Sequence, residues 1–255
     1  MWNPLGVLLA AAALLAACSS ATPEQPAASR PSPSPSATVL LATLVPTQTP
    51  TPAVTPTATL SIDLDGSPLL EETFASAVGW PTGEAASGAT TIMDGRLVVA
   101  IRQQLTSRLV TSPAEPAGGV FVEAEIEAQV CSPGDEYGLA FRIGPDQSYY
   151  RFTVGCDGSA RLTRVLPDRS LALVILEPGS AIVPGTEGAN RLAVLASGSS
   201  IRCFANGQEV ITLRDPVLTF GRQGVVVRAG RGGQTTVAFD SFRVLSLSPT
   251  ATPAP

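Results

Sequence analysis

The clearest indication of the fold is the segment Val120-Phe121-Val122-Glu123-Ala124-Glu125-Ile126-Glu127-Ala128-Gln129-Val130. Its even-numbered positions are all apolar, and from residue 123 onward its interior odd-numbered positions are Glu or Gln. Alternation with a period of two is typical of a β-strand that buries one face and exposes the other. The stretch therefore predicts a long strand whose carboxylates line up on the outward face, opposite an apolar core.

The same alternation continues through residues 69–247, where no long segment has the helical period of 3.6. Turn residues separate the runs, and Asn206-Gly207 supplies the two positive-φ positions that a tight hairpin needs. These features predict an all-β domain with two antiparallel sheets packed face to face. The expected strands are 96–102, 107–111, 119–130, 137–143, 149–154, 160–166, 171–176, 191–196, 200–205, 209–213, 223–229 and 235–245.

The alternation also predicts which side chains leave the core. In residues 137–143 we expect Leu139, Phe141 and Ile143 inside and Arg142 outside. The inward side chains expected from residues 149–156 are Tyr150, Phe152, Val154 and Cys156, and the outward ones are Tyr149, Arg151 and Thr153. Cys203 is expected to point inward and Cys131 outward at a strand end.

The segments outside this domain have different compositions. Residues 5–17 form an apolar run that is too short to span a bilayer but has the length of a signal-peptide core. The run ends in Leu15-Ala16-Ala17-Cys18, which resembles the lipobox of bacterial lipoproteins and implies lipidation of Cys18. We therefore expect a signal peptide at 1–18 and an extracytoplasmic protein that is anchored to the cell membrane through Cys18, although an ordinary cleaved signal is the alternative.

Residues 19–68 and 248–255 are rich in Pro, Thr, Ser and Ala. Such segments bury too little apolar surface to offset the entropy of ordering, so we expect a disordered linker and a disordered tail. Dense prolines favour extended polyproline II, which would hold the domain away from a membrane.

Composition excludes several functions. The chain has 21 acidic and 16 basic residues, all of the latter Arg, and it contains no His. A net charge of −5 argues against a nucleic-acid partner, and the absence of His excludes Ser-His-Asp and Cys-His catalysis. Among the cysteines other than Cys18, we favour a disulfide between Cys131 and Cys156, which lie where strands give way to turns, and this leaves Cys203 as a buried thiol.

Several segments, in order, resemble the concanavalin A-like jelly rolls, a group that includes LamG-like and 3-keto-disaccharide hydrolase-type domains. The segments that carry the resemblance are Glu72-Thr73-Phe74, Gly79-Trp80, Tyr137-Gly138-Leu139-Ala140-Phe141-Arg142, Tyr149-Tyr150-Arg151-Phe152, Asp157-Gly158, Asn206-Gly207-Gln208, Gly224-Val225 and Phe239-Asp240-Ser241-Phe242. They are mostly turn and core residues, so they indicate a fold more than an activity. The resemblance implies glycan binding or glycan processing.

If the predicted strands were neighbours, one outward face would carry the candidate ligand-binding residues. These are Glu125, Glu127, Arg142, Tyr149, Arg151 and, in a loop, Trp80. Polar groups on such a face can pair with sugar hydroxyls while an aromatic ring stacks on the sugar, but a solvated face with Glu–Arg pairs is the alternative. Trp80 can equally close one end of the sandwich.

Two further hypotheses, a glycosidase site and a calcium site, depend on carboxylates. Glycosidases need two carboxyl groups about 5–9.5 Å apart, and Glu123, Glu125 and Glu127 share one face, but they do not reproduce the Glu-x-Asp-x-x-Glu pattern of family 16 glycoside hydrolases on this fold. Asp240 with Asp63, Asp65 or Glu72 is the one candidate set for a structural Ca²⁺. We therefore expect a non-catalytic module for a glycan or another cell-surface ligand, with a glycan hydrolase and a structural or protein-docking module as alternatives.

Overall fold

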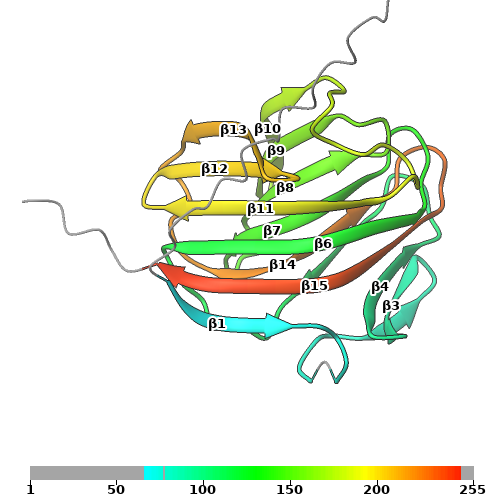
Figure 1. The fold of residues 1–255 in the computed structure, drawn as a ribbon, viewed down its shortest axis with the longest axis horizontal. Coiled ribbons are helices and arrows are strands. Elements are labelled where there is room, and N and C mark those ends of the chain that lie inside the picture. Colours follow the sequence, from blue (N-terminus) through cyan, green and yellow to red (C-terminus); the bar gives the residue numbers. More distant parts are fainter. Residues whose placement is uncertain (1–65, 77, 248–255) are drawn as a thin grey trace, which may run out of the picture. The chain divides into compact units, whose positions relative to one another are not determined.

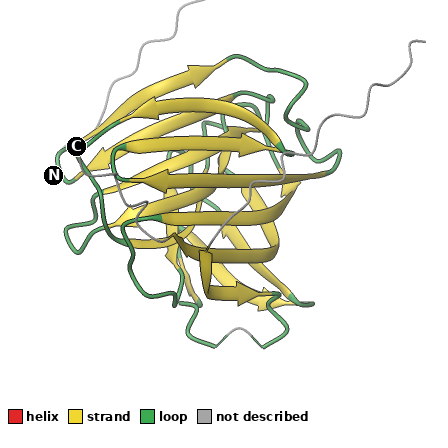
Figure 2. Ribbon diagram, turned by 60° about the vertical axis from the view of Figure 1, so that its left-hand side comes forward, coloured by secondary structure: helices red, strands yellow, loops and turns green. Residues whose placement is uncertain are grey.

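A computed structural model describes residues 66–76 and 78–247, and every regular element in these ranges is a β-strand (Figure 2). The strands form two antiparallel sheets that face each other, which confirms the predicted all-β sandwich (Figure 1). Cys18, the Pro/Thr-rich linker and the C-terminal tail lie outside the described residues. Within the described residues, no helix is long and apolar enough to cross a membrane.

Sheet A has nine strands, in the order β13-β12-β11-β6-β15-β4-β3-β2, with β1 paired to the free part of β15. Their bounds are β1 Gly66–Glu72, β2 Gly83–Ala85, β3 Gly88–Met93, β4 Arg96–Ile101, β6 Val120–Val130, β11 Ala189–Ser197, β12 Ser200–Ala205, β13 Gln208–Arg214 and β15 Thr235–Leu247. Because β15 is long, one of its edges pairs with β4 near Phe239 and with β1 from Phe242 onward.

Sheet B has six strands in the order β10-β9-β8-β7-β14-β5. Their bounds are β5 Ser107–Thr111, β7 Glu136–Ile143, β8 Tyr149–Gly155, β9 Ala160–Leu166, β10 Arg169–Leu176 and β14 Arg222–Arg228. Strands β7, β8, β9 and β10 follow one another through short turns, whereas β5 and β14 come from distant parts of the chain.

The core lies between the sheets and follows the predicted alternation in most strands. In β6 the even-numbered positions from Val120 to Ala128 are buried in the core, while Glu125 on the odd side is exposed. Opposite it, Leu139, Phe152 and Val225 of sheet B are fully buried in the same cluster. This continuous apolar layer is the main stabilising feature of the domain.

Arg142 is a correction to the sequence prediction. We expected it on the outer face, but it is completely buried, and its backbone adopts a φ of 55°. The register between β14 and β7 shifts here, because Arg222 pairs with Ile143 while Gln223 pairs with Phe141. The extra residue makes a β-bulge, which turns Ile143 to the outer face instead of the core.

The two sheets are joined at the end where β6 passes into β7. Cys131 and Cys156 form a disulfide with their Cα atoms 5.7 Å apart, the pairing that the sequence favoured, and Cys203 is a buried free thiol. Asp135, completely buried in the β6–β7 turn, accepts hydrogen bonds from the Ser132 and Gly230 amides at 2.8 and 2.7 Å and from the Thr235 hydroxyl. One carboxylate therefore ties three chain segments together.

Trp80 closes the sandwich near β15. It is 5 % exposed, and its ring lies edge-on to Phe74 and Phe242 with centroid distances of 5.3 and 5.2 Å. Such edge-to-face packing is the preferred geometry of aromatic pairs. Of its two predicted roles, Trp80 therefore has the structural one, and the predicted contact with a ligand is not supported by its burial.

Candidate functional site

The outer face of sheet B presents one continuous row of side chains across five strands. The register pairs Thr111 with Gly224, Gly224 with Ala140, Ala140 with Arg151, and Arg151 with Thr163. Neighbouring strands are about 4.8 Å apart, so the row spans roughly 20 Å. Its middle positions, Gly224 and Ala140, are small, which leaves a low floor between Thr111 and Arg151.

The two glycines on this face allow strands to approach closely. A Cβ atom at Gly138 would lie 2.1 Å from the carbonyl oxygen of Phe152, and one at Gly224 would lie 2.2 Å from that of Val110. No side chain fits where backbone atoms approach this closely. The smooth floor of the face is thus a direct consequence of the Gly residues in the sequence.

An apolar cluster lies beside this floor. Ala140, Ile143, Tyr149 and Val226 are buried on the outer face, with Leu109 and Val165 packed against them. Tyr149 is 7 % exposed, so it forms part of the cluster and is not a free stacking platform. Burial raises the pKa of the Tyr149 phenol, and the neighbouring Arg151 guanidinium acts in the opposite direction.

Charged groups lie at the end of the floor where β7 begins and β14 ends. The Glu136 carboxylate is 2.9 Å from the Arg161 guanidinium and 3.4 Å from that of Arg228, and it accepts a hydrogen bond from Thr153. A single buried carboxylate is therefore shared by two arginines, a network that holds both side chains over the sheet.

Arg151 and Thr163 are different, because neither has its polar atoms fully paired. The Arg151 Nε and the Thr163 Oγ1 are buried and have no hydrogen-bond partner among the described residues. Thr163 as a whole is only 3 % exposed. Since buried polar groups are nearly always paired in folded proteins, these neighbours on adjacent strands have unused hydrogen-bonding capacity.

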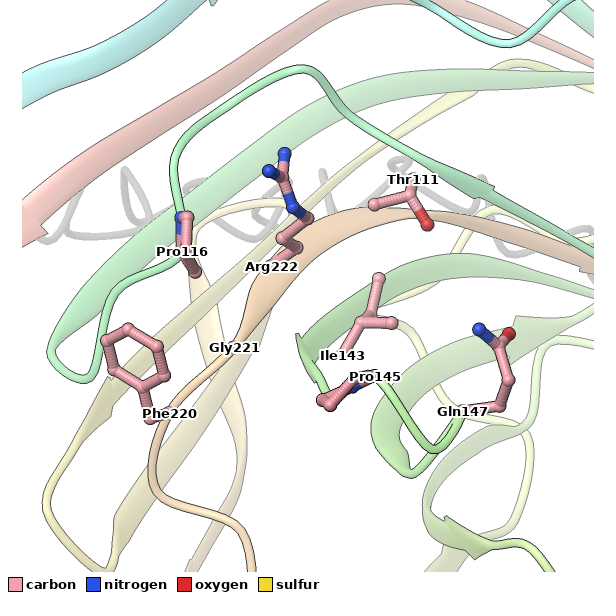
Figure 3. A pocket seen from close by; sticks show the side chains of 9 residues that line it. Thr111, Pro116, Ile143, Pro145, Gln147, Phe220, Gly221 and Arg222 are labelled. Atoms are coloured by element: carbon pink, nitrogen blue, oxygen red, sulfur yellow. The ribbon is translucent and has the colours of Figure 1, made fainter.

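A pocket adjoins the same face at the end where β5 and β7 finish and β14 begins (Figure 3). It encloses about 350 Å³. The residues that line it are Thr111, Pro116, Ile143, Gly144, Pro145, Gln147, Phe220, Gly221 and Arg222. They come from the ends of strands and from the loops 112–119, 144–148 and 215–221, a place where the sandwich fold commonly presents variable loops.

The buried Arg142 holds two of these loops in place. Its guanidinium donates to the carbonyl oxygens of Leu218 at 2.8 Å and Gly118 at 3.4 Å, and its Nε is buried without a described partner. Ala117 and Gly221 form a β-bridge between the same loops. Burial lowers the pKa of Arg142, and Tyr150 and Asp215 oppose that shift. Arg142 is thus positioned beneath the pocket, where it fixes the pocket walls.

The walls combine apolar surface with a few polar groups. Phe220 is 61 % exposed although it is aromatic, and Pro116 lies beside it (Figure 3). Arg222 reaches toward the β5–β6 loop and donates to the Ala114 carbonyl at 3.2 Å. Gln147, with a φ of 64°, and Thr111 supply further hydrogen-bonding groups. Small-molecule sites have this composition, with mostly apolar walls and a small number of polar groups.

The predicted site residues do not lie on one face, and this is the second correction. Glu125 and Glu127 are on β6, whose neighbours are β11 and β15 in sheet A, whereas Tyr149 and Arg151 are on β8 in sheet B. The prediction placed successive strands side by side, but β6 and β7 are consecutive in the chain and belong to opposite sheets. The structure brings together Tyr149 and Arg151 only.

The carboxylates of sheet A form a separate group. The Arg96 guanidinium lies 2.8 Å from Glu127 and 2.6 Å from Asp240, which is at a bulge of β15. Burial raises the pKa of Asp240, as do Glu125 and Glu127, while Arg96 acts in the opposite direction. Within the described residues no three potential ligands could hold a metal ion. Calcium binding by Asp240 stays a prediction, because Asp63 and Asp65 lie outside the described residues.

Sequence reasoning missed Phe220, Arg222 and Gln147. Phe220 lies in the loop 215–221, outside the alternating pattern. The available signal was its position: an aromatic residue in a loop, followed by Gly221, could have been predicted to be exposed. Gln147 is in a turn that was recognised only as a connection between strands. Arg222 is the first residue of β14, and the proximity of its strand end to the other two loops depends on the sheet order.

Two facing antiparallel sheets of this topology define the domain as a concanavalin A-like jelly roll. Among solved structures, it is similar to a carbohydrate-binding module, CBM66, from Bacillus subtilis, with 17 % identity and a TM-score of 0.54 over 67 % of this chain and 98 % of that one. It is also similar to a protein of unknown function with a galectin-like fold from Bacillus subtilis (14 %, TM-score 0.57, 72 % of this chain and 98 % of that one). A third is the catalytic domain of an endo-1,3-beta-glucanase from Thermotoga petrophila (12 %, TM-score 0.53, 72 % and 99 %). Neither a protein-family model nor a curated protein matches the sequence.

Proposed function

We propose that the domain binds a glycan, without cleaving it, in the pocket at the end of sheet B and on the outer face beside it. The observation that carries this proposal is the exposed Phe220 ring at a pocket of about 350 Å³ with Thr111, Gln147 and Arg222 around it. A sugar ring has an apolar face that stacks on an aromatic ring and hydroxyl groups that pair with such polar side chains. The pocket offers both kinds of contact within one small volume.

The similar structures support the proposal in a general way. They include a carbohydrate-binding module and a glucanase, so the fold accommodates both glycan binding and glycan cleavage in other proteins. At these identities the likeness extends to the fold alone, and the function is argued from the pocket.

The experiment is a glycan array probed with the full-length protein, followed by titration of the best ligand. Phe220→Ala is expected to weaken binding by about tenfold or more, because it removes the stacking surface. Met93→Ala is the matched control, since Met93 is also exposed but lies on β3 of sheet A. Equal affinities of the Phe220→Ala variant and the unchanged protein would refute the pocket as the site.

A glycan hydrolase is the second candidate, and the carboxylates of sheet A favour it. Burial raises the pKa of Asp240, and the Arg96 guanidinium contacts both Asp240 and Glu127, so this face carries two neighbouring carboxyl groups, the residue type that glycosidases use. Arg96 engages both carboxylates, which opposes such a role. A hydrolase would release reducing ends from its glycan, and Asp240→Asn would abolish the release. We expect no release from any glycan that binds.

We also propose that the chain is a lipoprotein that is held at the outside of the cell membrane through Cys18. The lipobox-like sequence before Cys18 supports this, and the Pro/Thr-rich segment that follows would separate the domain from the membrane. Metabolic labelling with a tagged fatty acid tests the anchor. Label is expected in the full-length protein and not in Cys18→Ser, and equal labelling of the two would refute it.

A further inference from the structure

The arginines around the site are not balanced by carboxylates. The strands place five charged residues on the outer face of sheet B and at its pocket, namely Glu136, Arg151, Arg161, Arg222 and Arg228. Glu136 is shared by Arg161 and Arg228. Among the described residues, four arginines on these strands therefore face Glu136 and, beside Arg161, Asp157 of the β8–β9 turn, although the whole chain carries a net charge of −5.

Arg222 and Arg151 account for most of this excess. Arg222 is exposed and donates to a backbone carbonyl, and none of the nine pocket-lining residues is acidic. The one carboxylate in the hairpin at 144–148 belongs to Asp146, which accepts from the Ser148 amide and hydroxyl at 3.1 and 2.7 Å. Asp146 is thus held within its own turn, and Glu115 of the opposite loop is exposed and does not line the pocket.

Arg151 has the unpaired Nε described above, and the unpaired Thr163 hydroxyl lies next to it on β9. Several arginines on sheet A pair with carboxylates, as Arg191 and Arg243 do with Glu123 and Arg202 does with Glu209. Arginines without a carboxylate partner, in and beside a partly apolar pocket, indicate that the missing negative charge belongs to the ligand.

We infer that the glycan is acidic, and that Arg222 in the pocket and Arg151 on the adjacent face bind anionic oxygens on its sugar rings. The inference rests on the proposed glycan-binding function and specifies its ligand class. A guanidinium matches the oxygen pairs of a carboxylate or of a sulfate ester, so uronic acid residues and sulfated sugars share the required chemistry.

The spacing of the two arginines suits a polymer with repeated charges. Their strands are two apart in sheet B, and the residues are offset by two positions along the strand. With about 4.8 Å between strands and about 3.4 Å per residue, their Cα atoms are roughly 12 Å apart. An oligosaccharide that reaches from the Phe220 pocket across Gly224 and Ala140 passes both.

The test compares polygalacturonate with its methyl ester, which has the same sugar but no charge, and adds dextran sulfate and neutral dextran. The full-length protein is expected to bind an acidic polymer at least about tenfold more tightly than its neutral counterpart. Arg222→Gln and Arg151→Gln are each expected to lose about tenfold in affinity for that polymer. Raising NaCl from 0.05 to 0.5 M should weaken binding several-fold, since screening shortens the reach of the charges.

The matched control is Arg214→Gln, which removes the same charge from an exposed position on β13 of sheet A. A general attraction to polyanions would be weakened equally by this control and would overturn the inference. Neutral polymers that bind as well as acidic ones would also overturn it, while the proposed glycan binding would stand. If no polymer or array glycan binds at all, the proposed function itself fails. Preference for polygalacturonate or for dextran sulfate decides between carboxylate and sulfate as the recognised group.

Discussion

Removing the disulfide is expected to cost the domain a large part of its stability. Cys131 and Cys156 are separated by 25 residues, and the bond closes a loop that contains all of β7 and β8. In the chain-entropy treatment, closing a loop of this length removes about 12 cal/mol/K from the unfolded chain, or about 3.5 kcal/mol at 25 °C. The loop spans the transition from sheet A to sheet B, so the native contacts that it supports are those between the sheets.

The assay is urea denaturation of the full-length protein, followed by tryptophan fluorescence. Trp80 is the buried reporter, since it packs between Phe74 and Phe242. The double variant with Cys131→Ala and Cys156→Ala is expected to unfold with a free energy about 3.5 kcal/mol below that of the oxidised protein. Its m-value should rise, because an unfolded chain without the cross-link exposes more surface.

Reduction of the unchanged protein is the control, because it breaks the cross-link but keeps both Cys side chains. If the cross-link accounts for the stability, the reduced protein should lose the same free energy of unfolding as the double variant, which also lacks the two sulfur atoms. A loss below about 1 kcal/mol in both samples would refute the entropic reasoning, since the loop would then constrain the unfolded chain little.

Three further predictions concern the buried groups. Asp135→Ala should lower the free energy of unfolding by about 3 kcal/mol or more in the same assay, because it leaves the Ser132 and Gly230 amides without their acceptor, and a loss under 1 kcal/mol would contradict the role of this carboxylate. Gly138→Ala should cost about 2–3 kcal/mol because its Cβ would meet the Phe152 oxygen at 2.1 Å, whereas Gly188→Ala, whose nearest contact is 3.6 Å, should be nearly neutral. Burial raises the pKa of all three tyrosines, Tyr137, Tyr149 and Tyr150, so the native protein binds more protons than the unfolded chain above pH 10. Stability is therefore expected to fall as the pH rises beyond the unfolded pKa of 10, and native absorbance at 295 nm that titrates at pH 10 would show that the phenols are not buried.

The sequence predicted the sandwich because alternation is a local signal. Val120–Val130 is apolar at every second residue, and between Val122 and Ala128 its burial follows that pattern in the structure. Strands β1, β2 and β3 were missed: Gly66–Glu72 contains a Pro and begins inside the predicted linker 19–68, and Gly83–Ala85 and Gly88–Met93 are short and rich in Gly, Ala and Thr. The pairing of β2 with β3 and of β3 with β4 comes from the sheet and not from their own composition.

The site was harder to predict because it depends on sheet order. Glu125 and Arg151 look like neighbours in sequence pattern, yet they are on opposite sheets, and no local signal distinguishes a hairpin from a crossing between sheets. Arg142 was assigned to the surface because its position in the alternation is polar. A single bulge reversed that assignment, and a positive φ at an arginine cannot be anticipated from its residue type.

The pairing of β1 with β15 places the first and last described residues side by side, with Gly66 opposite Leu247. The domain can therefore be spliced into a surface loop of another protein with almost no gap to bridge, because both junctions fall at one point. Tension applied across these two ends would separate β1 from β15 one residue pair at a time, starting at Gly66 and Leu247. The rest of the sandwich, including β8 and its arginine, would keep its shape until the last of those pairs had parted.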